Sequence, residues 1–246
     1  MDIQDFETVD SIPALYHPDL DLLVLSDLHL GLEGSMTSEG GYVPKFNLDD
    51  VLEEIEKARS STGASRVLVN GDLKNEFRKS YYSEKEEVKK LVQHLKRRFN
   101  EAIIVEGNHD QFIEKTVEDE GLEMHDYYLE DGVLFVHGDR KIEEIEEGLE
   151  YSTVVIGHEH PSLSLKDEIG VVEKVDCFLY GETEDGKNII VLPAFSNISS
   201  GTRINETPQR ELLSPILKEK VDVKGLKAIA VSREAGLFDF PEIGKL

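Results

Sequence analysis

Five apolar runs in this chain each end directly before a short polar motif that contains Asp, Asn or His. The runs cover residues 22–25, 66–69, 102–105, 133–136 and 153–156, and the motifs are Asp27-Leu28-His29, Gly71-Asp72, Gly107-Asn108-His109-Asp110, His137-Gly138-Asp139 and Gly157-His158-Glu159-His160. Short apolar runs bounded by polar turns are typical of buried strands. Because amphipathic stretches at Leu48–Arg59 and Ser83–Phe99 separate the first three runs, the sequence predicts a β-α-β-α-β opening.

The motifs are expected to converge in space. Ligands of such sheets bind at the carboxyl ends of the strands, where Asp27, Asp72 and Asn108 fall. His137 and His158 also follow apolar runs, so the second half should bring its side chains to the same edge from another sheet. Further runs, about 171–180, 188–192 and 228–231, are expected to complete that sheet in antiparallel fashion. With no internal repeat or Pro/Gly-rich linker, we expect one domain over residues 1–246, with a motif core of about 20–200 and a C-terminal extension of 201–246.

The motif side chains are suited to bind metal ions through oxygen and nitrogen. Asp27 and His29 are two positions apart, as are His158 and His160, so on extended backbone each pair points to one side. Asp72 is suited to bridge two ions because a carboxylate has two oxygens with free lone pairs. Asn108 adds a neutral amide oxygen and His137 an imidazole.

Such a ligand set predicts a particular chemistry. Two divalent cations about 4 Å apart polarise a phosphoryl oxygen, convert a bridging water to hydroxide near neutral pH, and neutralise charge on the leaving group. The sequence therefore predicts a phosphoester hydrolase. With one cysteine, Cys177, which we interpret as a small buried hydrophobe, the ligands are carboxylate, imidazole and amide. This set favours Mn²⁺, with Fe and Zn²⁺ as alternatives.

The charge of the chain restricts its partners. Fifty-one acidic against 27 basic residues give a net charge of −24, which disfavours an extended nucleic-acid-binding surface, although nucleic acid stays possible as a substrate. Two bound cations would make the centre locally positive, so an anionic substrate can still bind. A halophilic or salt-accumulating host is a further hypothesis for the acidity, because surface repulsion is screened there.

The location of the protein is a further prediction. The acidic start, MDIQDFETVD, lacks the features of a secretory signal, and no apolar run approaches the roughly 18 residues of a membrane span. We therefore expect a soluble, cytoplasmic protein without a membrane partner. Its oligomeric state is not readable from the sequence.

The motifs, in this order, resemble those of the calcineurin-like metallophosphoesterase superfamily: Asp-x-His, Gly-Asp, Gly-Asn-His-Asp/Glu, His and Gly-His-x-His. The resemblance covers roughly residues 20 to 200. GDLKNEF from Gly71 and PAFSNISSG from Pro193 resemble an archaeal branch near the DNA-ligase-associated phosphoesterases. The resemblance implies an α/β fold, the αββα four-layer sandwich, with two mixed sheets packed face to face, helices outside, and the metals along the shared edge.

The resemblance also implies roles for individual residues. One ion would be bound by Asp27, His29, Asp72 and His160, and the other by Asp72, Asn108, His137 and His158. His109 would face the leaving-group oxygen as a proton donor, and Asp110 would orient its imidazole. The chain departs from many relatives at Asn75, where they carry an acid or histidine. It also has Gln111-Phe112 where protein phosphatases commonly carry arginine, which disfavours protein dephosphorylation.

Several functional alternatives stay open. The substrate can be a nucleic-acid phosphodiester, a small cyclic or linear phosphodiester, or a phosphomonoester, and the resemblance favours a diester. A non-catalytic scaffold that keeps the fold is the alternative from another class. Segments 31–47 and 197–203 are candidate substrate-contacting loops. His17, His94 and His125 lie outside the motifs and are expected on the surface or in packing, with His94 on the solvated face of its helix.

Overall fold

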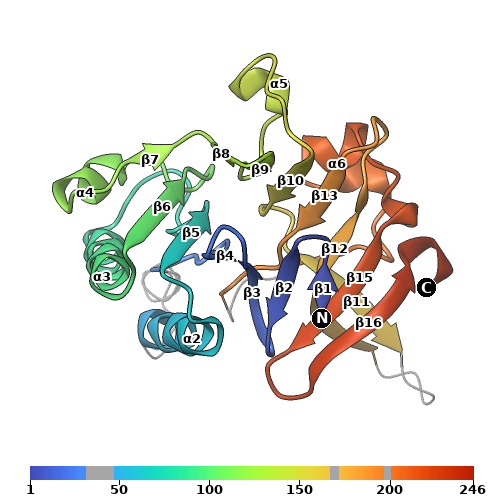
Figure 1. The fold of residues 1–246 in the computed structure, drawn as a ribbon, viewed down its shortest axis with the longest axis horizontal. Coiled ribbons are helices and arrows are strands. Elements are labelled where there is room, and N and C mark those ends of the chain that lie inside the picture. Colours follow the sequence, from blue (N-terminus) through green and yellow to red (C-terminus); the bar gives the residue numbers. More distant parts are fainter. Residues whose placement is uncertain (32–46, 167–171, 197–200) are drawn as a thin grey trace.

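The computed structural model describes residues 1–31, 47–166, 172–196 and 201–246, and these form two mixed β-sheets with helices around them (Figure 1). The candidate loop 31–47 therefore lies, except for its two ends, outside the described residues, as do 197–200. The first sheet contains, in spatial order, β1 (Asp2–Ile3), β2 (Phe6–Val9), β3 (Ile12–His17), β4 (Leu22–Leu25), β5 (Arg66–Asn70), β6 (Glu101–Val105) and β7 (Met124–His125). Neighbours are antiparallel from β1 to β4 and parallel from β4 to β7.

The second sheet is also mixed. Its main path runs through β14 (Thr202–Arg203), β11 (Pro161–Lys166), β12 (Val172–Glu182), β13 (Asn188–Val191), β10 (Thr153–Ile156), β9 (Val133–Phe135) and β8 (Tyr128–Glu130). Two further strands, β15 (Lys227–Ser232) and β16 (Gly236–Glu242), extend from β12. In this sheet β13 pairs parallel with β10 and antiparallel with β12, so the expectation of purely antiparallel completion is wrong for this strand.

The helices are few and cover the outer faces of the sheets (Figure 1). Those described are α2 (Asn47–Thr62), α3 (Tyr82–Arg98), α4 (Glu114–Asp119), α5 (Ile142–Ile145), α6 (Pro215–Glu219) and the short 3₁₀ turns η1 (Gln209–Glu211), η2 (Val223–Gly225) and η3 (Ile243–Lys245). Helix α2 packs through Val51, Ile55 and Ala58, whose spacing of four and three residues gives one apolar face. None of the described helices is both long and apolar enough to span a bilayer.

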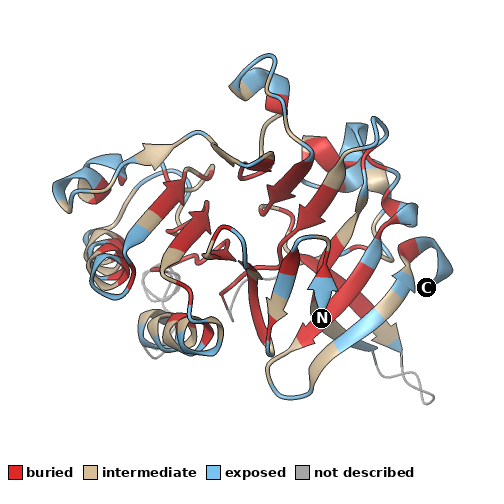
Figure 2. Ribbon diagram, in the orientation of Figure 1, coloured by how far each residue is buried: buried red, intermediate tan, exposed pale blue. Residues whose placement is uncertain are grey.

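Alternation of side chains along the strands builds the layers. In β4, Leu23 and Leu25 pack with α2 and α3, whereas Leu22 and Val24 face the second sheet. In β9, Phe135 meets the first sheet, while Leu134 packs on the other side with the C-terminal segments. The central strands are therefore buried on both faces, as Figure 2 shows, which explains why their sequences are continuous apolar runs. Three apolar clusters thus separate four layers, which confirms the predicted αββα sandwich of two face-to-face mixed sheets.

Other expectations have mixed outcomes. The β-α-β-α-β opening is confirmed in β4 to β6, but three N-terminal strands that the sequence analysis did not identify precede it. Of these, β1 and β2 have only two and four residues, too few for a periodic pattern to be recognised. Cys177 is fully buried, as expected, and burial raises the pKa of its thiol well above the usual value. His94 is not on a solvated face, because its Nε2 lies 3.1 Å from a carboxylate oxygen of Glu56 on α2 and links the two helices.

Candidate metal centre

The first-sheet half of the site consists of two loops that run side by side. Because β4 and β5 are parallel neighbours, the residues that follow them continue the pairing. The backbone N–H of Asp27 donates to the Gly71 carbonyl at 3.0 Å, and that of His29 donates to the Asp72 carbonyl at 3.0 Å. Asp27, His29 and Asp72 therefore lie together at the carboxyl edge of the sheet, as the sequence predicts.

Five of the candidate ligands have a backbone conformation that is not extended. Asp27, His29, Asp72, His158 and His160 have φ values of 60°, 46°, 55°, 64° and 45°. The expectation that the two-residue spacing acts through extended backbone is therefore wrong. Asp27 and His29 do converge on one group of candidate ligands, whereas His158 and His160 fall in two different groups. Non-glycine residues seldom adopt this left-handed conformation, and such residues cluster where function requires a fixed geometry.

Two motif glycines allow the loops to approach one another. A Cβ atom on Gly71 would lie 2.2 Å from Nδ1 of His137, and one on Gly107 would lie 2.2 Å from Oδ1 of Asp72. Both distances are far below van der Waals contact. The Gly-Asp and Gly-Asn pairs in the motifs therefore have a steric cause, since a larger residue would displace a candidate ligand.

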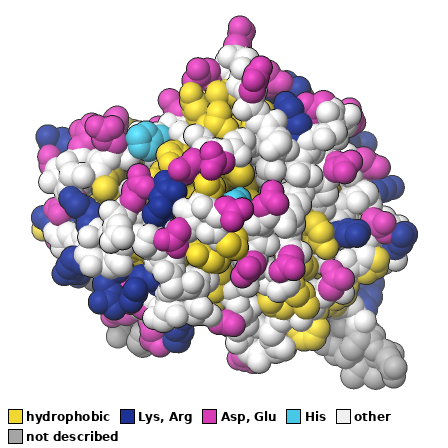
Figure 3. All heavy atoms as spheres, viewed as in Figure 1, with side chains coloured by type: hydrophobic (Ala, Val, Ile, Leu, Met, Phe, Trp, Pro, Cys, Tyr) yellow, Lys and Arg dark blue, Asp and Glu magenta, His cyan; other side chains and the backbone are white. Residues whose placement is uncertain are grey.

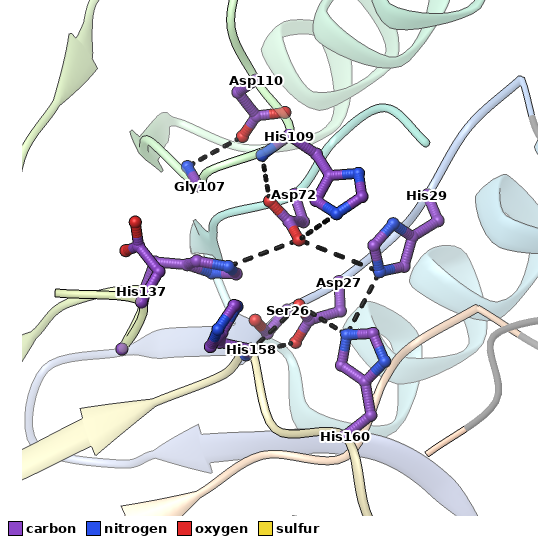
Figure 4. Close-up of polar contacts among 12 residues, drawn as sticks. Ser26, Asp27, His29, Asp72, Gly107, His109, Asp110, His137, His158 and His160 are labelled. Carbon is purple, nitrogen blue, oxygen red and sulfur yellow. Dashed lines mark hydrogen bonds and ion pairs between the residues drawn. The ribbon is translucent and has the colours of Figure 1, made fainter. Parts of the chain in front are cut away.

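The first group of candidate ligands joins both sheets. Ligand atoms of Asp27, His29, Asp72 and His160 all lie within 4.8 Å of one another (Figure 4). Nε2 of His160 is 2.9 Å from Oδ1 of Asp27 and 3.1 Å from Nε2 of His29. The group contains two carboxylates and two imidazoles and can hold one divalent cation.

The second group shares Asp72 with the first. Its members Asp72, His137 and His158 have ligand atoms within 4.8 Å of one another, and Nε2 of His137 lies 3.3 Å from Oδ2 of Asp72. Nδ1 of His137 contacts the Asn70 carbonyl at 3.0 Å, which directs Nε2 into the site. Oδ1 of Asn108 is buried without a hydrogen-bond partner among the described residues. Such an orphaned acceptor fits a cation that would coordinate it.

Electrostatics couple the buried groups. Burial opposes charge on His137, but Asp72 and Asp27 raise its pKa to about 10. Burial and neighbouring imidazoles lower the pKa of His29 and of His158 to about 4 each. Burial opposes ionisation of Asp72 too, yet its histidine neighbours keep the pKa of this carboxyl far below its usual range. At neutral pH the metal-free site therefore holds ionised carboxylates and a proton on His137 that a cation has to displace.

His109 lies beside the candidate ligands. Its ring stands edge-on to that of His29 with centroids 5.2 Å apart, and its Nε2 is 4.0 Å from Oδ2 of Asp72. Its side chain is 28% exposed, so solvent and substrate can reach it. Nδ1 pairs with the carbonyl oxygen of Asn75, which fixes the ring.

Asp110 does not contact the imidazole that it was expected to orient. Its buried carboxylate accepts hydrogen bonds from the backbone N–H groups of Leu73 at 2.8 Å, Gly107 at 3.0 Å and Lys74 at 3.3 Å. Burial and the charge of Asp72 raise the pKa of Asp110 to about 7. The aspartate therefore fixes the relative positions of two motif loops, and the backbone carbonyl of Asn75 takes the role expected of Asp110.

Sequence reasoning missed buried residues that hold the loops. Asn70 donates from Nδ2 to the carbonyls of Val136 and Val155, which joins the two sheets next to the site. Glu159, between two candidate ligands, accepts from the N–H groups of Leu213 and Ser214 at 2.8 Å each. Ser214 in turn donates from Oγ to the Gly138 carbonyl at 2.7 Å. The position of Glu159 inside a motif was a usable signal, whereas nothing in the sequence connects Ser214 with Gly138.

The chain is similar to a known protein family and to solved structures. Residues 20–162 match the calcineurin-like phosphoesterase family. Among solved structures, the chain is similar to the nuclease MPE of Pseudomonas putida, with a TM-score of 0.60, 16% identity, and coverage of 94% of this chain and 92% of that chain. It is also similar to YfcE, a phosphoesterase from E. coli, with a TM-score of 0.45, 16% identity, and coverage of 90% and 98%. No curated protein matches the sequence. At 16% identity, the similarity to the Pseudomonas putida structure shows that the two proteins share a fold.

Proposed function

This chain belongs to the calcineurin-like phosphoesterase family and is a metal-dependent phosphoester hydrolase, and from that premise we propose that it hydrolyses phosphodiesters at two metal ions. The proposal is carried by one observation: the candidate ligands form two clusters, each with carboxylate and imidazole side chains, and Asp72 belongs to both clusters. One group alone would suit a single structural ion. Two groups with a common carboxylate suit two ions close together, the arrangement that phosphoester hydrolysis uses.

The ligand roles follow from the two groups. We assign Asp27, His29, Asp72 and His160 to one ion, and Asp72, Asn108, His137 and His158 to the other. Oxygen and nitrogen donors without a thiolate favour Mn²⁺, with Fe and Zn²⁺ as alternatives. When bound, the cations would activate water near neutral pH and neutralise charge on the phosphoryl group.

His109 supplies the proton for the leaving group in this proposal. The carbonyl of Asn75 accepts from Nδ1–H, so that Nε2 points toward the candidate ligands and can carry the proton that is transferred. Asp110 is a positioning residue, because it fixes the loops on which His109 and Asp72 lie.

The proposal also specifies that the protein prefers phosphodiesters to phosphomonoesters. It is supported by the resemblance of GDLKNEF and PAFSNISSG to an archaeal branch near the DNA-ligase-associated phosphoesterases. A nuclease is also among the proteins that share this fold.

We further propose that residues 1–246 form one domain, which is supported by an apolar cluster with side chains from both sheets. We also propose a cytoplasmic location, which is supported by the free buried thiol of Cys177.

Parallel assays test this function. The metal-free protein is loaded with Mn²⁺, Fe²⁺ or Zn²⁺, the bound metal is counted by elemental analysis, and turnover is measured on bis-p-nitrophenyl phosphate, p-nitrophenyl phosphate and single-stranded DNA. We expect two ions per chain, fastest turnover with Mn²⁺, and hydrolysis of diesters ahead of the monoester. A preference for the monoester would make the protein a phosphomonoesterase. Two bound ions without turnover on any substrate would make it a non-catalytic scaffold.

A further inference from the structure

A loop next to the candidate metal centre combines aromatic and basic residues in an otherwise acidic chain. Residues 75–82, Asn-Glu-Phe-Arg-Lys-Ser-Tyr-Tyr, which we name the platform loop, connect the Gly71-Asp72 motif to α3. Acidic side chains are spread over the face of the molecule in Figure 3, with Lys and Arg interspersed. A segment that carries three aromatic rings and two cations, only a few residues from Asp72, is therefore a local exception to a net charge of −24.

The platform loop touches the catalytic side of the site. The Asn75 carbonyl pairs with Nδ1 of His109, and the ring of Phe77 stands edge-on to the His109 ring at 72°, with centroids 5.5 Å apart. Phe77 is 44% exposed and Tyr82 is 79% exposed. An apolar ring that stays partly in water beside the His109 imidazole is accessible to a ring of the substrate.

The cations of the loop are also accessible. Arg78 and Lys79 are exposed, and within the described parts of the chain neither forms an ion pair. The Lys79 ammonium lies 4.4 Å from the centroid of the Tyr81 ring. Both cations can therefore meet a phosphate without first breaking a salt bridge.

Two buried side chains, Lys74 and Glu84, fix the backbone of the platform loop through hydrogen bonds. Lys74 is fully buried and donates from Nζ to the carbonyls of Glu76 and of Lys79. Glu84 is also fully buried, and its carboxylate accepts from the N–H of Glu76 at 2.9 Å and from the N–H of Tyr81 at 2.8 Å. Burying charges is costly unless they are satisfied in this way. Their effect here is to fix the backbone that carries Phe77, Arg78 and Lys79, so a ligand need not order this loop on binding.

We propose that the platform loop binds single-stranded nucleic acid, with Phe77 stacked on a base next to the scissile phosphate and Arg78 and Lys79 on a neighbouring phosphate. The proposal rests on the phosphodiesterase function above and names its substrate. Alternating stacking rings and cations are how proteins hold single strands without reading sequence. A duplex keeps its bases stacked internally, so Phe77 could not reach a base face there, and the acidic remainder of the surface opposes extended duplex contact.

The experiment measures binding separately from hydrolysis. A fluorescein-labelled 20-nucleotide single strand is titrated with metal-free protein in EDTA and low salt, followed by anisotropy. Phe77→Ala is expected to weaken binding about tenfold, the effect of losing one stacked base. Phe77→Trp should restore it, and Phe238→Ala, which removes another exposed ring on the edge strand β16, should leave it unchanged.

Two further arms identify the groups that bind the strand. A strand with abasic sites in place of its bases should bind wild type and Phe77→Ala equally. The double variant Arg78→Ala/Lys79→Ala should reduce the slope of log affinity against log salt by about 0.7 for each phosphate that the protein no longer neutralises. Lys224→Ala/Lys227→Ala, which removes the same charge at exposed positions around η2 and β15, should keep the wild-type slope.

The outcomes separate this proposal from the function on which it rests. Hydrolysis of bis-p-nitrophenyl phosphate by the Mn²⁺-loaded wild type, together with equal strand binding by wild type and Phe77→Ala, would overturn the platform while leaving the phosphodiesterase intact. The absence both of strand binding in EDTA and of strand binding or cleavage by the Mn²⁺-loaded wild type at low salt would overturn it too. Failure to hydrolyse any diester would refute the phosphodiesterase function, whereas the binding measurements would still decide what the loop does. Thermal unfolding of each variant confirms that the exposed substitutions leave the fold intact.

Discussion

The two halves of the candidate metal centre are held in place in different ways. In the first-sheet half, the loops after β4 and β5 bond directly to each other, and Asp110 collects backbone N–H groups from Leu73, Lys74 and Gly107, all within the motif loops. In the second-sheet half, the buried carboxylate of Glu159 collects N–H groups from Leu213 and Ser214, far along the chain.

The two halves therefore differ in how far along the chain the partners of their buried carboxylates lie: Asp110 binds within the motif loops, whereas Glu159 binds a C-terminal segment. Ser214 also binds the Gly138 carbonyl, so one C-terminal segment holds both the His137 loop and the His158-Glu159-His160 loop. That segment lies outside residues 20–162, the part that matches the family. Loops in both halves bond directly to a neighbouring loop, since the N–H of Gly157 also donates to the His137 carbonyl at 2.8 Å. The second-sheet candidate ligands depend in addition on the C-terminal segment 213–214, which the motifs do not contain.

Asp72 joins the two halves, so its loss should have the largest effect. Asp72→Asn removes the charge that both ligand groups share, and turnover should fall by more than the roughly 100-fold that loss of an outer-shell partner costs. Elemental analysis should show fewer than two ions per chain. Asp19→Asn, at an exposed position, is the matched control and should retain both. Full metal occupancy in Asp72→Asn would refute a shared bridge.

His109 belongs to the first half but is not a proposed ligand, so the metal should survive its loss. His109→Ala should reduce kcat by about 100-fold, the lower end of general acid catalysis, while metal content stays at the wild-type value. A substrate with a better leaving group should recover part of the rate, because it needs no proton. The same substitution at the more distant His125 is the control. Equal loss of metal in His109→Ala and Asp72→Asn would remove the distinction between acid and ligand.

Glu159 tests how far the second half depends on the C-terminal segment 213–214. Glu159→Ala should weaken metal binding by about 10- to 100-fold, since outer-shell partners contribute that much. Ser214→Ala, which removes one hydrogen bond to Gly138, should weaken it by about 2- to 12-fold. Glu159→Gln keeps an oxygen acceptor for both N–H groups and should recover part of the loss. Glu182→Ala, at an exposed position on β12, serves as control in the same titration.

The metal affinity of the centre should rise with pH. Burial disfavours charge on His137, but Asp72 and Asp27 raise its pKa to about 10, so at pH 7 the metal-free imidazole is protonated. Because a cation must displace that proton, affinity should increase by about tenfold per pH unit between pH 7 and about 9. Calorimetry in buffers of different ionisation enthalpy should show a proton released on binding. Affinity independent of pH over this range would contradict the protonated state of His137.

Asn75 should give the smallest effect. The contact to His109 comes from the backbone carbonyl, which alanine also supplies, so Asn75→Ala should change kcat and metal affinity by less than about threefold. A large loss of kcat would instead give the Asn75 side chain, where this chain departs from the expected motif, a role of its own.

The sequence predicted which segments form strands better than it predicted how those strands pair or where single side chains lie. The strands β4, β5, β6, β9 and β10 were readable because they are buried on both faces and so appear as unbroken apolar runs. The pairing of β13 was not, because an apolar run carries no information on strand direction. His94 was misplaced because a helix sequence shows charge periodicity but not the neighbouring Glu56.

The sequence by itself determined which residues gather at the site. Each motif follows a strand that must be buried, and the carboxyl ends of such strands meet at one edge. Only the tertiary structure decided how those residues are held: the left-handed backbone of five candidate ligands, the carbonyl of Asn75 on His109, and Glu159 bound to Leu213 and Ser214. The physical reason is that burial is encoded in the type of each residue, whereas a hydrogen bond to a backbone group carries no signature of its partner in the sequence.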